Sequence, residues 1–143
     1  MILNLTKKKY LSRSPLYAIS YILRMRGMIG RSFRGADFDA MVFSNCNTIH
    51  TMFMSVRIDV VFVTRDNIVC GLKKALPPWM PFVRCCNALT TLELPEGTID
   101  LTGTQIGDIV DLCGVLTAES EQKLKENNKL EVETVISFKE SNK

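Results

Sequence analysis

The run Ile58–Val63 constrains the fold most strongly, because five of its six residues are apolar and four of those are β-branched, as strands favour. Side chains alternate between the two faces of a strand, so Asp59 shares one face with Val61 and Val63 and the other face is wholly apolar. We therefore expect a strand that is covered on both sides, within a β-rich domain. A carboxylate there needs hydrogen bonds or a charged partner, since otherwise burial raises its pKa.

The chain has 143 residues, 46% of them hydrophobic and 23% charged, which is typical of one globular domain. No apolar run reaches about 18 residues, and the apolar residues 16–23 lack the pattern of a signal peptide, so we expect a cytoplasmic protein. The sequence holds five cysteines and one histidine, without a Cys-x-x-Cys pair. This composition favours free thiols in a reducing compartment, and it predicts neither a metal site nor a cofactor.

Short apolar runs between turn residues predict most of the remaining elements. Ser14 and Pro15 suit an N-cap and a first helical residue, and apolar residues follow at helical spacing, so we expect a helix that ends at the glycines beyond them. Asp66 and Asn67 suit the turn of a hairpin, and the prolines around Trp79 predict a loop. Strands are expected at residues 40–44, 49–54, 58–64, 68–72, 88–94 and 109–113.

These elements predict a mostly β fold, α+β by content, built as a small barrel or a barrel-like sandwich of about seven strands with one N-terminal helix. We assign residues 1–116 to this domain and residues 117–143 to a C-terminal extension. The extension combines a short charged helix with the alternating run Leu130–Phe138, which predicts a half-exposed strand. Such a strand packs on the domain or pairs with a second chain, so we expect a monomer or a weak homodimer.

Polar residues on apolar strands mark a candidate site. His50 has the strand parity of Met52 and Met54, which predicts an apolar wall carrying one imidazole. The alternative is a core histidine bonded to a backbone carbonyl. Trp79 is expected on the core or over the mouth of a cleft. Glu93 has the parity opposite to its two leucine neighbours, so we expect it to be exposed, although it could face the same cleft.

The first 35 residues carry eight basic residues and no acid. Such a segment suits a nucleic acid or another anionic surface. It suits equally well a pairing with the more acidic remainder of the chain, which we favour because that pairing needs no partner. Basic residues interleaved with stacking aromatics are absent from the sequence.

Several short motifs occur along the chain in a fixed order. They are Arg26–Arg31, Cys46–Met54, Ile58–Val63, Pro78-Trp79, Leu92–Gly97 and Gly107-Asp108. With this order, residues 3–113 resemble the bacterial and archaeal family called domain of unknown function 192. The resemblance implies a compact, mostly β domain of barrel type with a helix near its start, and it implies no particular activity.

Carried over by position, the polar signature of that family falls on seven residues. These are Arg26, Arg31, His50, Thr51, Asp59, Glu93 and Asp108. The sequence departs from the family pattern at two places. Arg57 stands where the family usually has proline, which adds a charge beside Asp59, and the hairpin turn is Asp66-Asn67 where the family usually has Asp-Gly.

Three hypotheses follow for the function. The leading one is non-enzymatic binding of a small molecule or peptide in a recess near His50 and Asp59, with an unidentified ligand or protein partner. The second is a hydrolase-like enzyme that uses His50 with Asp59 or Glu93. The third is an interaction or nucleic-acid-binding module that uses the basic segment. The residues expected at the binding site are Arg26, Arg31, His50, Thr51, Met54, Asp59, Trp79 and Glu93.

Overall fold

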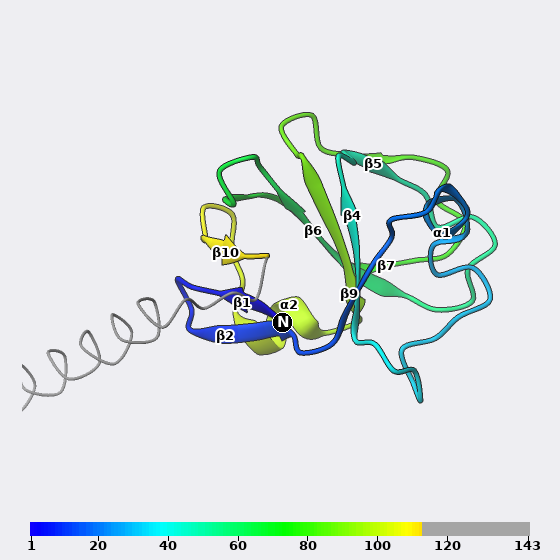
Figure 1. Cartoon of the computed structure of the whole chain (residues 1–143), viewed down its shortest axis with the longest axis horizontal. Helices are drawn as coiled ribbons and strands as arrows, with labels where there is room; N and C mark the ends of the chain where they lie inside the picture. Colours follow the sequence, from blue (N-terminus) through cyan, green and yellow to red (C-terminus); the bar gives the residue numbers. More distant parts are fainter. Residues whose placement is uncertain (113–143) are drawn as a thin grey trace, which may run out of the picture.

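The structure is a computed structural model, and it describes residues 1–112 (Figure 1). These residues form short strands and two short helices. The elements are β1 (Ile2–Asn4), β2 (Lys9–Ser12), β3 (Pro15–Tyr17), α1 (Tyr21–Arg26), β4 (Ala40–Ser44), β5 (Thr48–Ile49), β6 (Ile58–Val63), β7 (Val69–Leu76), β8 (Val83–Arg84), β9 (Thr90–Pro95), α2 (Thr98–Thr102) and β10 (Val110–Asp111). No helix within residues 1–112 has the length and apolar character to cross a membrane.

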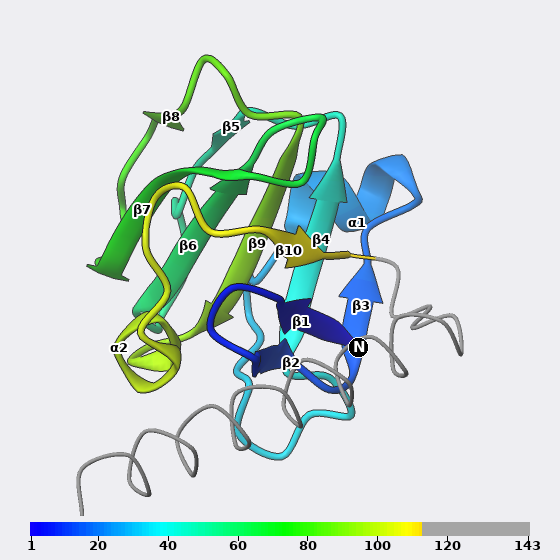
Figure 2. The same ribbon diagram turned by 90° about the vertical axis from the view of Figure 1, so that its left-hand side faces the viewer.

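A five-stranded sheet of order β3-β4-β9-β6-β7 forms the centre of the fold. The three-stranded sheet β10-β1-β2 lies over one of its faces, and α1 lies on the other side (Figure 2). The ribbon β5-β8 adds a third, two-stranded sheet. The covering of both faces explains the apolar run that dominates the sequence, because every residue of β6 is buried.

Two apolar clusters, one on each face of the central sheet, make up the core. Val61 and Val63 of β6 belong to the first cluster, beneath the three-stranded sheet. Val60 and Phe62 belong to the second cluster, on the side of α1 and the β5-β8 ribbon. The alternation predicted for Ile58–Val63 is therefore confirmed, and it decides which side chains can meet.

The hairpin that joins β6 to β7 is also confirmed. Asn67 adopts φ 61°, a left-handed conformation that asparagine tolerates better than most residues. The Thr64 hydroxyl oxygen accepts the backbone N–H of Ile68 at 3.2 Å and so closes the turn. The second strand runs to Leu76, beyond the predicted end at residue 72.

A closed barrel is not confirmed. Among residues 1–112 the central sheet ends at β3 on one side and at β7 on the other, and an isolated bridge between Ile68 and Ile109 links its β7 side to the three-stranded sheet without closing a ring of strands. The supported description is a mostly β fold with several sheets and two short helices. The predicted helix and strand of the C-terminal extension lie outside the described residues.

The predicted start of the N-terminal helix is wrong. Pro15–Tyr17 is strand β3, which pairs in parallel with β4, and α1 begins only at Tyr21. Ser20 is its N-cap, since the Ser20 hydroxyl accepts the Leu23 N–H at 3.2 Å. The N-cap character of Ser14 and Pro15 is therefore outweighed by tertiary pairing with a buried strand. The end of the helix at a glycine is as expected, at Gly27 with φ 48°.

Three further differences from the expected elements remain. The strand expected at residues 49–54 ends after Ile49, because the chain then turns and Phe53 adopts φ 62°. The short polar segment after Gly97 contains a helix, α2, that the sequence pattern did not predict. The final strand of the described region is shorter than expected and comprises only Val110–Asp111.

Candidate functional site

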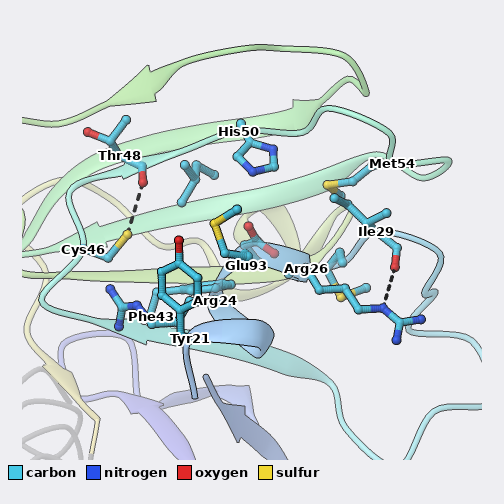
Figure 3. A pocket seen from close by; sticks show the side chains of 14 residues that line it. Tyr21, Arg24, Arg26, Ile29, Phe43, Cys46, Thr48, His50, Met54 and Glu93 are labelled. Atoms are coloured by element: carbon cyan, nitrogen blue, oxygen red, sulfur yellow. Dashed lines mark hydrogen bonds between the residues drawn. The ribbon is translucent and has the colours of Figure 1, made fainter. Parts of the chain in front are cut away.

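A pocket of about 240 Å³ opens between α1 with its following turn, strands β4 and β9, and the segment around β5 (Figure 3). Most of its wall is apolar, as in small-molecule sites. The lining residues are Tyr21, Arg24, Met25, Arg26, Gly27, Met28, Ile29, Phe43, Cys46, Thr48, Ile49, His50, Met54 and Glu93.

The acidic group of this pocket is Glu93, which β9 places on the α1 side of the central sheet. Glu93 pairs in register with Val60 of β6 and Met41 of β4, and both of these pack into the apolar cluster on that side. Its side chain is only 3% exposed, and its Oε2 is buried with no hydrogen-bond partner. Burial raises the pKa of Glu93 to about 8, so the carboxyl is mostly protonated at neutral pH.

The backbone after α1 passes beside this carboxyl at Gly27. A Cβ at this position would lie 4.0 Å from Glu93 Oε2 and 3.7 Å from Phe43 Cζ. The residue also adopts φ 48°, a conformation that side chains disfavour. The same glycine thus ends the helix and forms part of the pocket wall.

Basic residues flank the opening of the pocket (Figure 3). The Arg24 guanidinium donates to the Ser44 carbonyl at 2.7 Å, and Arg26 Nε donates to the Ile29 carbonyl at 3.4 Å. His50 is exposed and also lines the pocket. Within the described part of the chain Glu93 is the one acid of the lining, so the pocket combines two arginines with a carboxyl that is mostly neutral.

Asp59 lies on the opposite face of the sheet from this pocket. It pairs in register with Leu94, and Glu93 pairs with Val60, so the two carboxyl groups point to opposite sides. Both Asp59 carboxylate oxygens accept backbone N–H groups, from Ala75 at 2.9 Å and from Ile99 at 2.8 Å. Asp59 therefore fixes the irregular end of β7 and the first turn of α2.

Thr51 and Trp79 organise a loop outside the pocket. The Thr51 hydroxyl donates to the Pro77 carbonyl at 2.7 Å and accepts the Met80 N–H at 2.9 Å. Trp79 is 58% exposed and packs edge-on against Phe53, with ring centroids 5.0 Å apart. Neither residue is among those that line the pocket.

Asp108 and Arg31, two other residues of the family's polar signature, lie away from this pocket. Asp108 accepts Asn4 Nδ2 at 2.8 Å and the Gln105 N–H at 2.9 Å, and Lys7 Nζ is 3.7 Å away. Burial alone would raise the pKa of Asp108, but these hydrogen bonds outweigh it and hold the pKa below its usual value. Arg31 lines a separate, wider hollow of about 700 Å³ that includes Phe38.

Of the predicted site residues, the structure brings together Arg26, His50, Met54 and Glu93. It places Arg31, Thr51, Asp59 and Trp79 elsewhere. The expectation that Glu93 is exposed is wrong, because β9 lies inside the sheet and is covered on both faces. Residues 90–94 are all buried, and two of them are threonines. Polar and apolar residues therefore do not alternate with solvent exposure along β9, and the sequence pattern did not indicate that Glu93 is buried.

Sequence reasoning also missed the contributions of Tyr21, Phe43 and Cys46 to the pocket. Within residues 1–112, His, Cys, Asp and Glu side chains form no group of three that could hold a metal ion. The polar groups of the pocket are the buried Glu93 carboxyl, the arginines and the side chains of Tyr21, Cys46, Thr48 and His50, set in an apolar wall.

The fold and the pocket define a small, mostly β domain in which a buried acid, Glu93, lines a pocket of about 240 Å³. The chain belongs to the DUF192 family, whose model is described as an uncharacterized ACR and matches residues 16–112. This confirms the family resemblance carried by the ordered motifs.

Curated relatives carry a family name without a stated activity. A UPF0127 protein of Thermococcus sibiricus is 32% identical, over 78% of this chain and 73% of its own length. A UPF0127 protein of Pyrococcus furiosus is 30% identical, over 75% of this chain and 93% of its own length. A crystal structure of a protein of unknown function from Novosphingobium aromaticivorans is similar in fold, with a TM-score of 0.66 and 20% identity, covering 77% of this chain and 81% of that one.

Proposed function

We propose that this protein binds a small, largely apolar molecule in the pocket between α1, β4, β9 and β5, and that the head group of the molecule hydrogen-bonds to Glu93. The observation that carries the proposal is the Glu93 Oε2, which is buried at the pocket and has no partner. Buried polar atoms in proteins are nearly always paired, and an exception suggests a missing partner.

The energetics favour a ligand at this position. An unpaired buried polar group lowers stability by about 1–3 kcal/mol, and a ligand donor or acceptor that pairs with it recovers part of that loss on binding. The volume of about 240 Å³ is just below the range of roughly 300–1,000 Å³ that is common for drug-sized ligands. A compact ligand of one ring or a short branched chain fits this volume best.

The charges of the site select the head group. A protonated carboxyl offers one O–H donor and a carbonyl acceptor, which is the complement of a carboxamide. A cationic amine meets Arg24 and Arg26 at the mouth, where like charges disfavour it. A neutral group with both a donor and an acceptor is therefore the preferred partner of Glu93.

A matched set of three probes tests this proposal: benzamide, benzylamine and toluene, which share one ring and differ in the head group. We expect benzamide to perturb the backbone amide signals of Gly27, Met28 and Glu93 in an NMR titration at pH 6.5, and to bind at least several-fold more tightly than the other two. Glu93→Gln keeps a hydrogen-bonding group and should retain that preference, whereas Glu93→Leu should abolish it. Failure of all three probes to perturb these signals at millimolar concentration would contradict the proposal.

A hydrolase-like activity is the second candidate, because His50 and Glu93 line one pocket. The pairing lacks a direct contact: among the hydrogen bonds of residues 1–112, none joins the two side chains. A protonated Glu93 could act as a general acid, and a His50 imidazole could act as a base. Hydrolysis of 4-nitrophenyl acetate above the background rate, lost in both His50→Ala and Glu93→Leu, would support this candidate over simple binding.

A cytoplasmic location also stays a proposal, and it rests on the sequence pattern.

Nucleic-acid binding by the basic N-terminal segment is the third candidate. Part of this segment is engaged within the chain, since Lys7 Nζ donates to Gln105 Oε1 at 2.9 Å and Lys9 Nζ donates to the Leu101 carbonyl at 3.1 Å. This arrangement agrees with the pairing of the basic segment with the rest of the chain that we favoured from the sequence.

A further inference from the structure

Two cysteine thiols meet on the α1 side of the central sheet, away from Glu93. Cys70 lies on β7, and Cys85 follows β8 directly. Their Sγ atoms are 3.5 Å apart, and both thiols are free and partly buried. Because 15 positions separate them in the sequence, their contact is a product of the fold.

The surroundings of the two thiols hold them in this contact. Cys85 Sγ donates to the Cys70 carbonyl at 3.6 Å, and Cys70 Sγ donates to the Phe62 carbonyl at 3.5 Å. Gly71 makes room for the approach, since a Cβ at this position would lie 3.1 Å from Cys85 Sγ and 3.3 Å from Phe62 Cδ2. A larger residue at position 71 would push the Cys85 side chain away from the strand.

We propose that Cys70 and Cys85 form a dithiol that a low-molecular-weight disulfide, with oxidised glutathione as the probe, converts into an intramolecular disulfide. A Cys85 thiolate attacks one sulfur of the oxidant, whose S–S bond breaks and releases one thiolate. The Cys70 thiol then loses its proton and attacks Cys85 Sγ, which releases the second thiol. The two cysteines lose two electrons and two protons in total, and the oxidant gains them as two thiols.

The geometry requires only a small movement. A disulfide has an S–S length of about 2.05 Å, so the two sulfur atoms must approach by roughly 1.5 Å from their separation of 3.5 Å. Burial, together with the neighbouring Cys85 thiol, raises the pKa of Cys70 to about 11. The second step is therefore slow near neutral pH and accelerates as the pH rises.

A disulfide between Cys70 and Cys85 would join β7 to the β5-β8 ribbon, which contributes one wall of the pocket. The Cys85 N–H donates to the Asn47 carbonyl at 2.9 Å, and Thr48 pairs with Arg84 in the β5-β8 ribbon. Thr48 and the two residues after it line the pocket. Oxidation would thus tether the ribbon that carries one pocket wall to β7 of the central sheet, whatever ligand the pocket takes.

The test uses the full chain, fully reduced and then treated with oxidised glutathione at pH 8. We expect the intact mass to fall by two hydrogen atoms, and peptide mapping without reduction to link the peptides of Cys70 and Cys85. Dithiothreitol should restore the starting mass. The matched controls Cys46→Ser and Cys86→Ser should still form this link, and Cys70→Ser and Cys85→Ser should not.

Three results would overturn the proposal: glutathione adducts as the stable products at these cysteines, a link that joins other cysteines, or an unchanged mass. If the serine variants fail to fold, thiol counting with a maleimide on the unaltered chain decides instead. The expected result is two fewer reactive thiols after oxidation than before. These readouts involve no ligand, so they are independent of the function proposed for the pocket.

Discussion

Replacing Glu93 with glutamine should remove a specific pH dependence of stability. Burial raises the pKa of Glu93 to about 8 in the folded chain, against an ordinary value of 4.5. The folded state therefore binds a proton at this site that the unfolded state releases. The stability contributed by the protonated group is complete below pH 4.5 and is lost as the pH rises through about 8.

The magnitude follows from the two pKa values. Each pKa unit corresponds to about 1.36 kcal/mol, so the interval from 4.5 to about 8 corresponds to about 5 kcal/mol of lost stability. At pH 7 roughly 3 kcal/mol of this has been lost. Glu93→Gln keeps the shape of the side chain and does not titrate, so this term is absent from the variant.

Urea unfolding at intervals from pH 5 to pH 9 measures the effect. We expect the free energy of unfolding of Glu93→Gln, minus that of the unaltered chain, to rise by about 1.4 kcal/mol per pH unit up to about pH 8 and then to level off. Glu96→Gln, at an exposed position nearby, is the matched control for the chemical change. A difference that stays constant with pH, or that falls as pH rises, would refute the assignment of Glu93 as a buried, protonated acid.

Three further changes probe the scaffold and the pocket wall. Asp59→Asn removes one of two backbone hydrogen bonds at a buried site, so urea unfolding should show a loss of about 1–3 kcal/mol, whereas benzamide binding should not change once the variant is folded. Asp108→Asn should be less stable than the unaltered chain at pH 7, and this difference should shrink as the pH falls below about 4, because the folded pKa of Asp108 is lowered. Gly27→Ala places a Cβ at φ 48° beside Phe43, so thermal unfolding should show a loss of about 1 kcal/mol, and benzamide should bind more weakly; a stabilised variant would contradict the account of this glycine.

The sequence was sufficient to predict the central part of the fold. The composition of Ile58–Val63 allows few arrangements other than a strand buried on both faces, and the Asp66-Asn67 pair suits a tight turn in which Asn67 can adopt a positive φ. These are local properties of the residues. The closed barrel is not confirmed because the arrangement of strands depends on which edges pair over long distances, and the sequence alone does not encode that in any short pattern.

Local signals misled where tertiary pairing competes with them. Ser14 and Pro15 have the character of a helix start, yet pairing of Pro15–Tyr17 with β4 makes a strand. This strand is held at its beginning by Asp39, whose carboxylate accepts the N–H groups of Arg13 and Ser14. Differences in intrinsic helix propensity are only a few tenths of a kcal/mol per residue, so these tertiary hydrogen bonds outweigh them.

The grouping of the candidate residues follows the sequence prediction only in part, and their role as a site stays a prediction. Arg26, His50 and Glu93 are at one pocket, as the list of candidate residues anticipated, but Asp59 points the other way. The reason is register: Asp59 and Glu93 lie on neighbouring antiparallel strands at positions offset by one residue, which places them on opposite faces. No property of either residue in the sequence fixes that offset.

A carbon-13 NMR titration of the Glu93 carboxyl, with and without benzamide, measures the protonation of the proposed recognition group itself. We expect a midpoint near pH 8 in the free protein and a midpoint at still higher pH with benzamide, because the amide pairs best with the protonated acid. A midpoint near the ordinary value of 4.5, or one that benzamide leaves unchanged, would contradict the claim that Glu93 is the recognition group of a ligand-binding pocket.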